Sequence, residues 1–153
     1  MAIARTSPLI RPGGHPLLRF LTSFPIAFFF GALLTDFTYF RTANQMWADF
    51  SAWLLAAGIA MGGLAALVGI VTLIMSPAAR AHRPLWPLVV GSAIVLILGF
   101  VNNLVHSRDA WTSVVPVGLI LSAATVILTL ITIWLSAARE TRLVELDYAG
   151  VRS

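Results

Sequence analysis

The hydrophobic positions of this chain fall into four long runs separated by short polar segments. The runs cover about residues 20–40, 53–75, 86–106 and 112–136. Each holds about twenty residues or more, which is the length that a helix needs to cross the roughly 30 Å hydrocarbon core of a bilayer. The pattern therefore predicts an all-α membrane protein with four transmembrane helices.

The polar links between these runs are short, so consecutive helices are expected to lie side by side as an antiparallel bundle. We expect an N-terminal segment 1–19, a transmembrane domain 20–136 and a tail 137–153. The mixed charges of the tail suit either an amphipathic interfacial helix or a disordered segment. Arginine is concentrated in the two ends and the second link, whereas Arg41 and Arg108 fall on the other side. The positive-inside rule then places both termini in the cytoplasm.

Composition agrees with a lipid environment. Hydrophobic residues make up 59% of the chain and charged residues 10%, and the mean hydropathy is +0.91. These values lie far from those of soluble domains, of which about a quarter of the residues are charged. The chain has no cysteine, which excludes disulfides, thiolate metal sites and cysteine nucleophiles. Its arginines are scattered rather than clustered, so the high isoelectric point does not indicate nucleic-acid binding.

Two stripes of small residues indicate how the helices pack. In the second run, Gly58, Gly62 and Ala66 are spaced by four. The fourth run carries a heptad-like series of small and hydroxyl residues, namely Gly118, Ser122, Thr125, Thr129, Thr132 and Ser136. Such stripes allow close approach of helices in membranes. These stripes could pack against other helices of the same chain. The alternative is that one of them forms the interface of a homodimer.

Polar and ionisable residues gather at the end of the predicted bundle opposite the termini. The candidates for one cluster are Asp36, Arg41, Asn102, Asn103, His106, Arg108 and Asp109, with Tyr39 and Asp49 nearby. An ionisable group inside a span requires a partner. One interpretation is a network that fixes the helix ends. The other is a site for a small polar ligand, a quinone head group or a partner's extramembrane domain, with His106 as proton donor or acceptor.

Three histidines raise the question of a metal or haem site. His15 and His82 fall at the predicted cytoplasmic end, whereas His106 lies about 30 Å away at the other end. His15 and His106 therefore cannot share one iron in this topology. No metal site or cofactor is predicted. The alternative is haem b, which would have to use His15 with His82, both in loops. The chain also lacks a nucleophile elbow, a Walker loop and a zinc-binding helix motif, so the sequence does not favour an enzyme.

Two segments resemble a known family. They are GGHPLLRFLTSFPIAFFFGALLTDFTYFRTANQMWADFSAWLLAAG and NNLVHSRDAWTSVVPVGLILSA, and they are similar to the bacterial membrane proteins grouped as domain of unknown function 2231. The resemblance extends over about residues 14–135. It implies a four-helix inner-membrane protein of unassigned biochemistry that is sometimes fused or adjacent to redox proteins.

Taken together, these observations predict an integral protein of the bacterial inner membrane. We expect an accessory or interaction subunit of a membrane complex, with a respiratory or redox complex as one setting. Its expected partners are the lipid bilayer and other membrane subunits or a periplasmic protein. The alternative function is a haem b-binding or quinone-reactive electron-transfer subunit.

Overall fold

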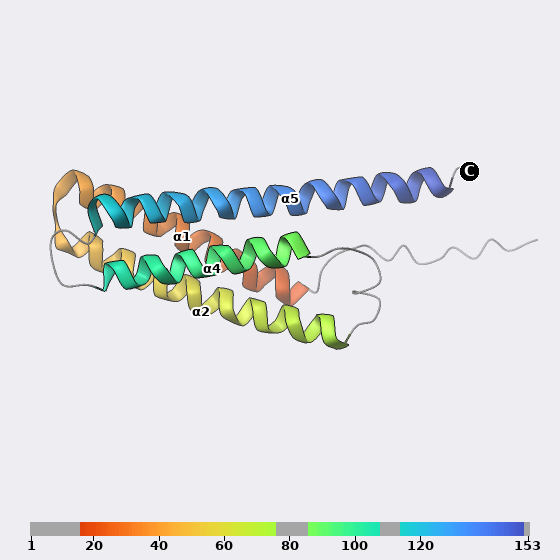
Figure 1. Ribbon diagram of the computed structural model, residues 1–153, viewed down its shortest axis with the longest axis horizontal. Helices are drawn as coiled ribbons and strands as arrows, with labels where there is room; N and C mark the ends of the chain where they lie inside the picture. Colours follow the sequence, from red (N-terminus) through yellow and green to blue (C-terminus); the bar gives the residue numbers. More distant parts are fainter. Residues whose placement is uncertain (1–15, 76–85, 108–113, 152–153) are drawn as a thin grey trace, which may run out of the picture.

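The computed structural model describes residues 16–75, 86–107 and 114–151. Within these ranges lie the helices α1 (Pro16–Thr42), α2 (Gln45–Met75), α4 (Trp86–His106) and α5 (Leu119–Val151), with one irregular turn, η1 (Val114–Gly118), before α5. The helices alternate in direction, and α1 and α4 each lie beside both α2 and α5 (Figure 1). The described ranges contain no strand. The predicted antiparallel four-helix architecture is confirmed.

All four helices are long and apolar enough to cross a membrane. Large apolar side chains cover the outside of the bundle, including Phe30, Leu67 and Trp134, whose exposed fractions are 51%, 58% and 68%. Contiguous apolar surface on this scale is unfavourable in water and is expected in contact with lipid. The first and last helices point their chain ends toward the same end of the bundle (Figure 1). The location of that end in the cytoplasm stays a prediction.

The core of the bundle is built around Phe29 of α1. Its ring lies between two glycines, because a Cβ added at Gly58 of α2 would come 2.7 Å from the ring and one added at Gly99 of α4 would come 3.0 Å from it. The buried cluster around it draws on all four helices and is completed by Ala32, Leu55, Val95 and Val126. The glycines thus provide the space that a bulky aromatic ring needs between three helices.

The glycine stripe of α2 turns with the helix. Gly58, Gly62 and Ala65 are buried, whereas Ala66 is exposed. An α-helix has 3.6 residues per turn, so a constant spacing of four drifts by about 40° at each step. The stripe that packs within the chain therefore continues to Ala65, and the predicted packing role of Ala66 within the bundle is corrected.

The hydroxyl series of α5 faces the bundle, as its spacing indicated. Gly118, Ser122, Thr125 and Thr129 are buried, and Thr132 and Ser136 are half-buried. Most of these hydroxyls donate to the carbonyl oxygen four residues earlier, for example Thr129 to Thr125 at 2.7 Å. This is the usual arrangement for threonine in an apolar helix. Ser122 is different, because its hydroxyl reaches another helix.

The structure differs from the predicted fourth span, 112–136, at both of its ends: in η1, which precedes α5, and at the end of α5. Val115 has a non-helical backbone (φ −118°, ψ 127°), which is typical of a residue that precedes proline. At the other end α5 continues to Val151 and extends past the other helices (Figure 1). The tail as far as Val151 is therefore helical, and its position at a membrane interface stays a prediction.

A two-residue turn connects α1 to α2. Ala43 adopts a left-handed backbone conformation with φ of 53°, and its amide donates to the carbonyl oxygen of Tyr39 at 2.7 Å. Asn44 then caps α2, since its Oδ1 accepts a hydrogen bond from the amide of Met46 at 3.1 Å. This cap explains why α2 begins at Gln45, well before the apolar run. The turn holds α1 and α2 together at the end where the polar residues gather.

Candidate functional site

Asp36 is the central residue of a buried polar cluster in the last two turns of α1. It shares a stripe of the helix with Phe29, Ala32 and Tyr39, all of which are buried, because spacings of three and four keep residues on one face. The side chain of Asp36 is fully buried. A carboxyl group in this position needs hydrogen-bond partners, since an uncompensated charge in a membrane bundle is costly.

His106, the last residue of α4, provides the first of these partners. Its Nε2 lies 2.8 Å from Oδ1 of Asp36, and its Nδ1 lies 2.9 Å from the backbone carbonyl oxygen of Asn102. A carbonyl oxygen only accepts, so Nδ1 carries a hydrogen. One further proton then lies between Nε2 and Oδ1. Whichever of the two atoms holds it, the pair is neutral overall, which suits burial in an apolar bundle.

Ser122 of α5 links the pair to a third helix. Its hydroxyl donates to Oδ2 of Asp36 and accepts a hydrogen bond from Nδ2 of Asn102 at 2.7 Å. Asn102 and Ser122 are both buried. We call Asp36, Asn102, His106 and Ser122 the polar cluster. It ties α1, α4 and α5 together through side-chain hydrogen bonds.

One atom of the polar cluster lacks a partner. Among the described residues, Oδ1 of Asn102 is a buried side-chain oxygen with no hydrogen bond. Leaving such an acceptor unpaired costs about 1–3 kcal/mol. Buried polar groups are nearly always hydrogen-bonded, so this oxygen is an exception to the usual pattern.

A smaller polar contact joins α2 to α1 at the same end of the bundle. The hydroxyls of Thr35 and Ser51 are 2.7 Å apart, and Ser51 also lies within hydrogen-bond distance of the carbonyl oxygens of Ala32 and Trp47. Ser51 is fully buried. The sequence did not single out Ser51 for this contact. Its position one turn after Trp47, in the polar start of an otherwise apolar helix, is the signal that could have identified it.

The structure brings together some of the predicted cluster residues and separates others. Asp36, Asn102 and His106 meet, and Asn103 is half-buried beside them in the chain. Arg41 is exposed in the last turn of α1, and Asp49 is exposed on α2 near Gln45. Arg108 and Asp109 lie outside the described residues. Ser122, which the sequence indicated as a packing residue, is in addition a member of the polar cluster.

Of the three histidines, His106 lies within the described residues. His15 and His82 lie outside the described residues, whereas His106 has both ring nitrogens within hydrogen-bond distance of oxygen atoms. Within the described ranges no group of three His, Asp or Glu side chains is arranged to hold a metal ion. Ligation of iron by His106 would therefore require it to give up either Asp36 or the Asn102 carbonyl.

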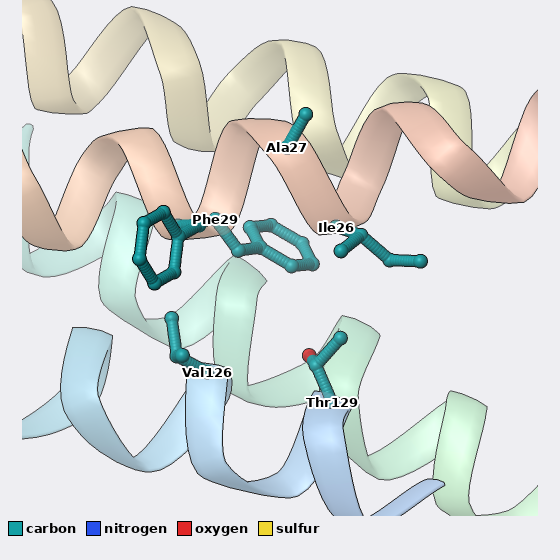
Figure 2. Close-up of a pocket in the computed structure, with 6 residues that line it drawn as sticks. Ile26, Ala27, Phe29, Val126 and Thr129 are labelled. Atoms are coloured by element: carbon teal, nitrogen blue, oxygen red, sulfur yellow. The ribbon is translucent and has the colours of Figure 1, made fainter. Parts of the chain in front are cut away.

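An apolar cleft of about 200 Å³ lies between α1 and α5. Figure 2 shows Ile26 and Phe29 on α1 opposite Val126 and Thr129 on α5, with the side chain of Ala27 on the other side of α1, and Phe30 completes the lining. About half of Phe30 is exposed, so the cleft opens on the side of the bundle. It lies between the same two helices that Asp36 and Ser122 connect.

A comparison with family models gives a match over residues 14–142, to the family described as predicted membrane protein (DUF2231). The chain belongs to the DUF2231 family. The match includes all four membrane-spanning helices and every residue of the polar cluster. No curated protein and no solved structure matches the chain. This DUF2231 protein is thus a predicted membrane protein whose chemistry must be inferred from its own residues.

Proposed function

We propose that this DUF2231 protein is a non-enzymatic accessory subunit of the bacterial inner membrane that recognises a small polar ligand or a polar group of a partner through its polar cluster. The observation that carries the proposal is the fully buried Asp36, held by His106 and Ser122 from two other helices. Ionisable residues inside membrane bundles are rare and commonly belong to ligand or ion pathways.

The arrangement of the polar cluster supports recognition more than catalysis. Both nitrogens of His106 already have partners, and the buried hydroxyl of Ser122 has partners on both sides, Asp36 and Asn102. A nucleophilic serine needs a base that accepts its proton together with donors for an oxyanion. The described residues show hydrogen-bonded side chains with one unpaired acceptor, which is the arrangement expected of a binding site.

The test is purification from the native membrane after gentle solubilisation, with identification of every protein and small molecule that accompanies the chain. Asp36→Asn is the informative variant, because the amide can donate to Nε2 of His106 and accept from Ser122 while it removes the ionisable group. Asp49→Asn, at an exposed carboxylate of α2, is the matched control. We expect companions with the wild type and Asp49→Asn and their loss with Asp36→Asn. A wild-type protein that is recovered without companions would contradict the proposal.

The redox alternative has a separate test. A haem b-binding subunit would show an absorbance band near 400 nm after purification or after reconstitution with haem. The hydrogen bonds of His106 to Asp36 and to the Asn102 carbonyl favour the non-haem function, so we expect no such band. A band that disappears in His15→Ala, His82→Ala or His106→Ala would replace the accessory function by the electron-transfer one.

A further inference from the structure

The apolar cleft between α1 and α5 lies at the middle of both membrane spans. Phe29, which lines it, is the central residue of the span Pro16–Thr42. Val126, on the opposite wall, is the central residue of the span Val114–Ala138. The hydrocarbon core of a bilayer is about 30 Å thick, so the cleft lies roughly 15 Å from either surface of that core. Its depth therefore restricts the occupant to groups that are found at the centre of a membrane.

The lining of the cleft offers no free hydrogen-bond donor to an occupant. Its one polar side chain is that of Thr129, whose hydroxyl donates to the carbonyl oxygen of Thr125 at 2.7 Å. The other five lining residues have hydrocarbon side chains. A buried water needs two to four polar partners, and apolar cavities without them stay dry. The occupant that fits this lining is hydrocarbon.

The exposed residues around the cleft are too large for a second helix to pack closely against it. Phe30 at the opening is 51% exposed, and Ile127 and Leu130, next to the lining residues of α5, are each 56% exposed. Helices approach each other closely in membranes where their interfaces carry small residues. A whole helix is also about 10 Å wide, whereas a flexible chain can enter a cleft of about 200 Å³.

We propose that the cleft between α1 and α5 binds the end of an acyl chain of a membrane lipid, which enters from the side of the bundle. A lipid with its head group at either surface has its chain end near this depth. Apolar cavities of about 150 Å³ accept molecules as large as benzene, so the cleft has room for several methylene groups. Lipid tails are as apolar as the lining. Binding is therefore driven by the van der Waals contacts that the chain makes in a space that is otherwise unfilled.

This inference goes beyond the proposed function, because the cleft contains no residue of the polar cluster. The two proposals also fail separately. Recovery of companions and their loss with Asp36→Asn concern the polar cluster alone, whereas the experiment below measures lipid at the cleft and requires no partner protein.

The experiment uses the full-length protein in vesicles of phosphatidylcholine and phosphatidylglycerol that contain a small fraction of phosphatidylcholine with a diazirine at the end of one acyl chain. Illumination converts the diazirine to a carbene, which inserts into nearby side chains, and peptide mass spectrometry locates the labels. Thr129 is 9% exposed, whereas Ile97, the central residue of the α4 span, is 62% exposed. Incidental contact should label Ile97 about seven times as much as Thr129, in proportion to their exposed fractions. A chain held in the cleft should label Thr129 at least as much as Ile97.

A variant that fills the cleft tests whether this labelling depends on the space. Ile26 is half-buried in the lining, and Ile26→Trp should lower the labelling of Thr129 about tenfold by taking the place of the chain. The matched control is Ile97→Trp, at the same depth on α4, which should leave the labelling of Thr129 as it is in the wild type. Leu55 is fully buried in the core and should stay unlabelled in both variants while the bundle is intact.

A second measurement needs no variant. A phosphatidylcholine with the diazirine next to the carboxyl group of the chain carries the probe near the membrane surface, so it should label Thr129 about tenfold less than the lipid labelled at the chain end. Equal labelling of Thr129 by the two lipids, labelling in proportion to exposure, or no effect of Ile26→Trp would overturn the proposal. Protection of both Thr129 and the exposed Leu130 would also overturn it, because a second protein chain would then cover the cleft.

Discussion

Nε2 of His106 lies 2.8 Å from Oδ1 of Asp36, which joins the end of α4 to the end of α1 across 70 positions of the sequence. The backbone carbonyl of Asn102 fixes the imidazole from its other side, so the ring presents Nε2 to the carboxyl group. The contact is therefore both a link between distant helices and a buried hydrogen bond between two ionisable side chains.

Asp36→Ala should lower the free energy of unfolding by about 2–4 kcal/mol, because it leaves both His106 and Ser122 without their buried partner. Asp36→Asn should cost less, since its amide can bond to both neighbours. Asp49→Ala removes an exposed carboxylate and should change stability by about 0.5 kcal/mol or less. Unfolding in mixed micelles measures all three. A loss in Asp36→Ala no larger than that in Asp49→Ala would show that the Asp36 contact does not stabilise the bundle.

Ser122→Ala should destabilise the protein by about 1–3 kcal/mol, because it removes one partner each from Asp36 and Asn102 inside the bundle. Ser136 is the matched control on the same helix. Its hydroxyl donates to the carbonyl oxygen of Thr132 within α5, so Ser136→Ala should cost about 0.5 kcal/mol or less. The comparison is again made by unfolding in mixed micelles. Equal effects of the two substitutions would mean that the contact between α1 and α5 contributes nothing beyond local hydrogen bonding.

The architecture could be predicted from the sequence because lipid imposes simple requirements. A span needs about twenty apolar residues, and its polar backbone groups must be satisfied within the helix. Asp36, Asn102 and His106 could be predicted to meet because ionisable and amide groups near the ends of apolar runs need partners, and short links bring alternate helix ends together. Both inferences use only the order of residues along the chain.

The remaining details depend on helix rotation, which the sequence does not specify. Ser122 could be recognised as part of a small-residue stripe, but its hydrogen bond to Asp36 depends on the angle at which α5 faces α1. Ala66 and Ala65 differ by 100° around α2, so a count by fours assigned the buried position to the wrong neighbour. The continuation of α5 to Val151 likewise could not be decided, because a mixed-charge tail is compatible with either state.

The contact of Phe29 with Gly58 leads to a test of the core. In Gly58→Ala the new Cβ would lie 2.7 Å from the ring of Phe29, and the ring cannot retreat because Gly99 is close behind it. We expect a loss of about 1–3 kcal/mol from this overpacking. Gly63→Ala is the control, since its Cβ would meet no atom within 4 Å, and it should be neutral or slightly stabilising. Thermal unfolding in micelles compares the two, and a stable Gly58→Ala would indicate that α1 and α2 are further apart than described.

The turn between α1 and α2 offers a substitution that should stabilise the protein. Ala43 has a φ of 53°, a conformation that costs an L-residue about 1–2 kcal/mol and costs glycine little. Glycine also makes the unfolded chain more flexible, which offsets part of this gain, so Ala43→Gly should raise the free energy of unfolding by about 0.5–1 kcal/mol. The same exchange inside a helix has the opposite sign, and Ala60→Gly in α2 should lower stability by about 0.5–1 kcal/mol. A parallel loss of stability in the two variants would show that Ala43 does not adopt the left-handed conformation in the membrane protein.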